Sequence, residues 1–172
     1  MPGTTLTMAQ AAAMYDGTIK ELVRRFKFDH ARAAYKPLAT LIATSLPFFA
    51  TGWTVVPVPT VAAHIRQRGY DHALLMAKEV AKQKNLPLQR LLRRSRDNRQ
   101  VGANRAERQA QSKGVFESKN AAGKRIVLID DVCTTGATLT AAAAALKSAG
   151  ATEVQAAVVA WQQPKLYKKK DR

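Results

Sequence analysis

The sequence contains 172 residues, 47% of them hydrophobic, and carries a formal net charge of +16. This length fits one ordinary domain, and no apolar run approaches the roughly 18 residues that a membrane-spanning helix needs. The single cysteine, Cys133, excludes an internal disulfide and a cysteine-rich zinc site, and no secretory signal is visible at the start, so a cytoplasmic location is expected.

The first part of the chain is predicted to be helical. Residues 1–14 show no periodic pattern and are expected to form a loose N-terminus. Asp16 is placed to cap a helix that runs to about Phe28, along which apolar residues recur at helical spacing. A second helix is predicted over residues 30–46, with a break or restart at Pro37.

The middle of the chain mixes short elements with polar connections. WTVVPV, residues 53–58, is typical of a short strand, and residues 60–68 are expected to form a basic loop. A helix is predicted over residues 70–84, and a short strand within residues 86–92. The polar, arginine-rich segment 95–113 is expected to be a mobile loop with some helix.

The last part predicts strands alternating with a helix. A strand is predicted over residues 125–130, where residues 126–129 are apolar without polar alternation, which indicates burial on both faces. A helix is predicted over residues 138–149, ended by Gly150, and a strand over residues 152–161. This alternation predicts an α/β class with a largely parallel sheet.

The positive charge is concentrated in two segments. Residues 88–113 contain eight basic and two acidic residues, and residues 165–172 contain five basic and one acidic residue. Such clusters favour polyanionic partners, either nucleic acid or phosphorylated small molecules. A solvated basic face or, at the end of the chain, a disordered tail is the simpler alternative.

The stretch VLIDDVCTTGAT, residues 127–138, carries the most informative motif. It leads from the buried strand into the start of a helix, where unpaired N–H groups and a partial positive charge attract anions. Gly136 lets the main chain approach a ligand, and the threonines add hydroxyl donors. We therefore predict a cradle for a phosphate monoester. Its residues are Cys133, Thr134, Thr135, Gly136, Ala137 and Thr138.

Two adjacent acids, Asp130 and Asp131, need another explanation because carboxylates repel phosphate. Carboxylates accept hydrogen bonds strongly from hydroxyls, so the pair suits the adjacent hydroxyls of a ribose 5-phosphate, and either acid could orient Mg²⁺ directly or through water. The alternative is an ordinary capped helix after a strand. The glycine-rich signatures of P-loops and of dinucleotide-binding folds are absent from the sequence.

Residues 127–138 as a whole resemble the 5-phosphoribosyl 1-pyrophosphate (PRPP) motif of type I phosphoribosyltransferases. More narrowly, residues 15–161 resemble the ComF family of competence proteins, through YDGTIKELVRRFKF, VVPVPT and RGYDHALLMAKEVA. The four-cysteine zinc ribbon usual in that family has no counterpart in this sequence. Asp71-His72 and Gln111 also depart from the family pattern.

The resemblance implies a Rossmann-like phosphoribosyltransferase fold, mainly parallel, in one domain over residues 15–163. Its N-terminal helical hood would comprise residues 15–50, residues 95–113 would form a mobile flap, and residues 164–172 a basic tail. The implied reaction displaces pyrophosphate from PRPP by a nitrogen nucleophile, with Mg²⁺ as cofactor. The residues that this implies are Asp130, Asp131 and Arg105 for catalysis, Asp130 and Asp131 for the metal, and Arg66 and Arg68 for pyrophosphate.

A non-catalytic role is the alternative. The family's link to DNA uptake and the basic clusters fit a competence factor that binds single-stranded DNA or a helicase partner. A homo-oligomer is compatible with either role. The sequence itself identifies no acceptor for the phosphoribosyl group.

Overall fold

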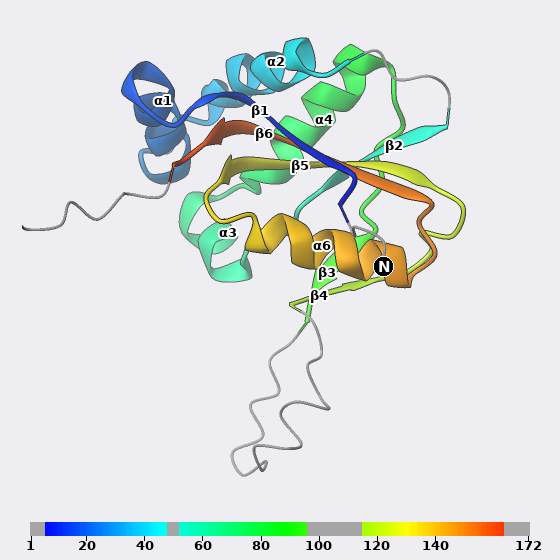
Figure 1. The fold of residues 1–172 in the computed structure, drawn as a ribbon. Coiled ribbons are helices and arrows are strands. Elements are labelled where there is room, and N and C mark those ends of the chain that lie inside the picture. The colour runs from blue at the N-terminus through cyan, green and yellow to red at the C-terminus, as the bar shows by residue number, and fades with distance from the viewer. Residues whose placement is uncertain (1–5, 48–51, 96–114, 164–172) are drawn as a thin grey trace, which may run out of the picture.

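A four-stranded parallel sheet forms the centre of the protein, and its strand order is β1-β6-β5-β2 (Figure 1). The computed structural model describes residues 6–47, 52–95 and 115–163. The strands of the sheet are β1 (Met8–Met14), β2 (Trp53–Pro57), β5 (Arg125–Cys133) and β6 (Glu153–Trp161). The predicted α/β class with a largely parallel sheet is confirmed.

Helices cover both faces of this sheet and divide the core into two clusters. One face carries α1 (Gly17–Phe28), α2 (Tyr35–Ser45) and α4 (His72–Lys84), and the opposite face carries α6 (Ala137–Ser148). The smaller elements are η1 (Arg32–Ala34), α3 (Ala62–Arg68) and the antiparallel pair β3 (Leu92–Arg94) and β4 (Phe116–Ser118). No helix within the described ranges has the length and apolar character needed to cross a bilayer.

Strand β5 shows why an uninterrupted apolar run predicts a central strand. Its four apolar residues from Ile126 to Ile129 are all fully buried. Ile126 and Leu128 pack on the α6 side, whereas Val127 and Ile129 pack on the side of α1, α2 and α4. Because successive side chains point to opposite faces, both faces of this strand need apolar residues, and polar groups can appear only where the strand leaves the core.

Two predictions about local structure are wrong. Residues 8–14, expected to be loose, form strand β1 beside β6, and Gln10 anchors it by donating to the carbonyl of Ser45. Alanine and glutamine have little intrinsic preference for strands, so pairing with β6 decides the conformation. Residues 62–68, expected to be a loop, form the short helix α3, which ends at Gly69 with a φ of +78°.

The other predicted elements are present with shifted ends. Asp16 precedes α1 without a side-chain capping bond, and Pro37 lies in the first turn of α2, where its missing N–H removes no helical hydrogen bond. The strand expected within residues 86–92 begins only at Leu92. Of the flap predicted at residues 95–113, residues 96–113 lie outside the described residues, as does the tail at residues 164–172.

Gly150 is expected to be sensitive to substitution. Its φ is +92°, and an added Cβ would lie 3.0 Å from the Cα of Ala122. Gly150→Ala should lower the unfolding free energy by about 2 kcal/mol, because left-handed strain adds to a backbone clash. Urea unfolding measures this. Gly123→Ala is the matched control, since φ is +72° there and nothing lies within 4 Å of the added Cβ. Equal losses in the two variants would contradict the clash.

Candidate functional site: the carboxyl edge of strand β5

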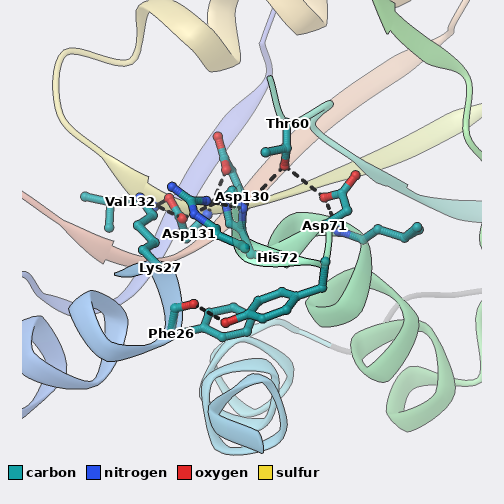
Figure 2. Close-up of polar contacts among 11 residues, drawn as sticks. Phe26, Lys27, Thr60, Asp71, His72, Asp130, Asp131 and Val132 are labelled. Atoms are coloured by element: carbon teal, nitrogen blue, oxygen red, sulfur yellow. Dashed lines mark hydrogen bonds and ion pairs between the residues drawn. The ribbon is translucent and has the colours of Figure 1, made fainter. Parts of the chain in front are cut away.

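The acid pair sits where β5 leaves the core, and its two side chains face different sides of the strand (Figure 2). Asp130 is partly exposed, whereas Asp131 is only 4% exposed. The Asp131 backbone N–H donates to Asp130 Oδ1 over 2.9 Å, and the Val132 N–H donates to Asp131 Oδ1 over 2.6 Å. These bonds fix both carboxylates relative to the main chain.

Asp131 is held by two cationic or hydrogen-bonding partners from different helices. Its Oδ2 lies 2.7 Å from Lys27 Nζ, on α1, and 2.8 Å from His72 Nε2, on α4 (Figure 2). Burial alone would raise the pKa of Asp131, but the bond from His72 and the charge of Lys27 outweigh it and hold the pKa at about 2. Asp131 is therefore an ionised carboxylate turned towards the helices.

His72 is oriented in turn by Arg68. Arg68 Nη1 lies 3.0 Å from His72 Nδ1, and Thr60 Oγ1 lies 3.4 Å from the same nitrogen. Because a guanidinium can only donate, His72 Nδ1 accepts, and the ring proton is on Nε2, facing Asp131. Asp71, at the start of α4, accepts from Thr60 Oγ1 and from the N–H of Leu74 and so ties α4 to the segment after β2.

Asp130 faces a cleft of about 220 Å³ at the carboxyl edge of the sheet. Burial, with the charge of Asp131 as the second cause, raises the pKa of Asp130 to about 7. The cleft, called here the Asp130 cleft, is lined among others by Thr60, His64, Arg94, Asp130, Val132 and Thr138. It therefore brings together residues from the loop after β2, the end of β3, the end of β5 and the start of α6.

The predicted phosphate turn is intact and open to solvent. Gly136 has a φ of +77° and directly precedes α6. Exposed side chains flank it; they belong to Thr134, Thr135, Ala137 and Thr138. Thr135 Oγ1 accepts from the N–H of Ala137 over 3.4 Å. Burial raises the pKa of the Cys133 thiol and outweighs the opposing effect of the Gly136 backbone N–H.

The two arginines predicted to hold pyrophosphate, Arg66 and Arg68, lie in different environments. Arg66 is exposed on α3, whereas Arg68 is 8% exposed and points to His72. Arg105 lies outside the described residues. Arg94, which the sequence did not single out, lines the Asp130 cleft; its Nε donates to the carbonyl of Pro59 over 2.9 Å, and its guanidinium lies 5.0 Å from the Phe116 ring centroid.

The donor set at the acid pair fits a magnesium ion only in part. Ligand atoms of His72, Asp130 and Asp131 lie within 4.8 Å of one another. His72, which the sequence did not assign to the site, thus lies beside both acids. His72 Nε2 and Asp131 Oδ2 contact each other, however, which leaves the Asp130 carboxylate as the free hard ligand of the kind that Mg²⁺ prefers.

Comparison with known proteins agrees with this geometry. The family described as "Phosphoribosyl transferase domain" matches residues 71–172. The chain therefore belongs to the phosphoribosyltransferase domain family.

Within that family, the chain is similar to competence proteins. It is 30% identical over 142 residues to competence protein ComFC of Bacillus subtilis and 30% identical over 148 residues to competence protein F of Haemophilus influenzae. These alignments cover 79% and 78% of this chain, and the chain spans 56% and 64% of those relatives. The resemblance to the ComF family is thereby confirmed.

Solved structures support the fold. Glutamine PRPP amidotransferase from B. subtilis, complexed with ADP and GMP, aligns with a TM-score of 0.51 at 24% identity. A structure described as the allosteric regulatory enzyme of purine biosynthesis aligns with a TM-score of 0.53 at 21% identity. Each alignment covers 72% of this chain and 25% of the other, so the likeness concerns the domain fold.

Proposed function

We propose that this protein binds PRPP, or another ribose 5-phosphate compound, together with Mg²⁺ in the Asp130 cleft and transfers the phosphoribosyl group to a nitrogen acceptor. One observation carries the proposal: the partly exposed Asp130 carboxylate and Thr138, in the first turn of α6, line the same cleft, and the exposed threonine-rich turn leads directly into that helix. A ribose 5-phosphate needs both, a hydrogen-bond acceptor for its hydroxyls and main-chain donors for its phosphate.

Each part of the cleft has a role in this reaction. The N–H groups after Gly136 and the threonine hydroxyls bind the 5-phosphate, and Asp130 accepts from a ribose hydroxyl. Arg94, which lines the cleft, offers positive charge to the pyrophosphate, as does Arg66 from α3; Arg105 is a further candidate. Asp130 would hold Mg²⁺, which when bound would supply positive charge beside the pyrophosphate. Catalysis then consists mainly of positioning and electrostatic stabilisation.

Asp130→Asn should weaken PRPP binding about 10- to 100-fold, because an amide accepts less strongly from a hydroxyl and is a poorer magnesium ligand. Isothermal titration with PRPP and Mg²⁺ measures the affinity, and pyrophosphate release with a panel of bases and amines measures turnover. Asp16→Asn makes the same chemical change at an exposed site with no capping bond and should leave both values unchanged. PRPP affinity that survives Asp130→Asn would contradict the proposal.

The cellular role proposed here is in DNA uptake, in the cytoplasm, because the curated relatives are named competence proteins. A second candidate function is favoured by the net charge of +16: a non-catalytic factor that binds single-stranded DNA or a competence helicase. Titration with single-stranded DNA at two salt concentrations tests it, since contacts with phosphates weaken steeply as salt rises. DNA binding that is unaffected by Asp130→Asn, with no pyrophosphate release, would favour this second function.

A further inference from the structure

The C-terminal turn of α1 is docked firmly beside the acid pair. The Tyr70 hydroxyl donates to the carbonyl of Phe26, and the two rings stack with centroids 5.5 Å apart. The next residue, Lys27, extends its side chain to the Asp131 carboxylate and is itself only 22% exposed (Figure 2). The ammonium group is therefore delivered to Asp131 by a helix whose position is set by packing.

The Asp131 carboxylate of this ion pair lines the Asp130 cleft together with Asp130. The N–H of Asp131 donates to Asp130 Oδ1, so a rotation of the main chain at Asp131 would also move the Asp130 carboxylate. A phosphorylated ligand in the cleft would meet two adjacent carboxylates. The Lys27 ammonium offsets the negative charge of Asp131 and so lowers the electrostatic repulsion that such a ligand would meet.

We propose that Lys27 is a positioning residue of the ligand site. With His72, it fixes the Asp131 carboxylate beside Asp130 on the wall of the cleft and offsets its charge, so that the cleft tolerates a polyanion. Arg68 acts one step further away, by fixing the His72 tautomer that donates to Asp131. The inference rests on the proposed function in so far as the ligand is a sugar phosphate.

The residues that hold Asp131 come from helices that are far apart in the sequence. Lys27 comes from α1 and His72 from α4, and both contact the Asp131 side chain at the end of β5, whereas Arg68, from α3, contacts His72. A pair that served stability alone could lie anywhere in the core. Here the contacts end on Asp131, which lines the Asp130 cleft beside Asp130, and α1 thereby becomes a structural part of the site.

Calorimetric titration with PRPP and Mg²⁺ tests the inference on three variants. Lys27→Met should weaken PRPP binding about tenfold or more, because it leaves Asp131 without its cation. Lys27→Arg, which keeps the charge, should stay within about threefold of the wild type. Lys20→Met makes the same change at an exposed position of the same helix and should bind PRPP like the wild type. Lys27→Gln replaces Lys27→Met if the latter does not fold.

The possible outcomes separate this inference from the proposed function. If Lys27→Met lowers the Tm but binds PRPP within twofold of the wild type well below that Tm, Lys27 is only structural and the inference fails while the function stands. If the wild type itself does not bind PRPP, both fail. Nitrogen-15 NMR adds an independent signature: His72 should show the Nε2–H tautomer, and Arg68→Met should alter it. The opposite tautomer in the wild type would overturn the relay through Arg68.

Discussion

Replacing Phe26 by alanine should lower the unfolding free energy by about 3 to 5 kcal/mol, the usual range for removing a buried aromatic ring. Phe26 is fully buried, stacks on Tyr70 and meets His72 edge to face at a centroid distance of 6.2 Å. The cavity would therefore form directly beneath the acid pair. Urea unfolding followed by circular dichroism measures the loss.

Phe28→Ala provides the control on the same helix. The Phe28 side chain is 60% exposed and contacts the guanidinium of Arg68 at 5.4 Å. Its removal should cost less than about 1 kcal/mol, since the Phe28 ring is already largely exposed, little apolar surface changes its environment, and a cation–π contact with a solvated ring is weak. Comparable losses for Phe26→Ala and Phe28→Ala would show that the C-terminal turn of α1 is not docked as described.

The acid pair should give the protein an unusual dependence of stability on pH. The pKa of Asp130 is raised to about 7, so the folded state keeps a proton that the unfolded state has already lost above pH 4. Unfolding free energy should therefore fall as pH rises from about 4 to 7, by about 1 to 3 kcal/mol. Asp131 acts with the opposite sign: because its pKa is held at about 2, its contribution is present above pH 4 and is lost as pH falls towards 2.

Asp130→Asn isolates the first of these effects. Its side chain does not titrate, so the decline in unfolding free energy between pH 4 and 7 should flatten relative to the wild type, without magnesium or ligand. Asp16→Asn, at an exposed position, should keep the wild-type slope. Urea midpoints at half-unit pH steps give the comparison. A wild-type curve that rises over this interval, or an unchanged slope in Asp130→Asn, would refute the raised pKa.

The elements predicted correctly are those whose conformation is decided by local pattern. Strand β5 has an uninterrupted apolar run, and α1 and α4 have apolar residues at helical spacing, so burial and propensity agree. Strand β1 has no such local signal, because its alanines become a strand only through pairing with β6. The conformation of that segment is determined by a distant strand, so the local sequence alone does not predict it.

The candidate site likewise contains residues that the sequence predicts and residues that it does not. The phosphate turn could be predicted because all of its parts are contiguous from Asp130 to Thr138. The partners of Asp131 could not, since Lys27 and His72 are distant in sequence and meet it only through the packing of two helices. One sequence signal could have pointed to Arg94 as a site residue: it lies at the end of a short strand in the arginine-rich region. The orientation of its side chain into the cleft, however, depends on contacts with Pro59 and Phe116.

The placement of β1 has a practical consequence for expression of this protein. Similarity to the ComF family becomes recognisable near Tyr15, and that position invites truncation. A shortened protein starting there would lose the strand that pairs with β6 along Gln155–Trp161. The exposed edge of β6, which is largely alanine and valine, would then pair with the backbones of other chains. Precipitation of such a fragment would reflect the cut, and retaining the first fourteen residues should restore soluble behaviour.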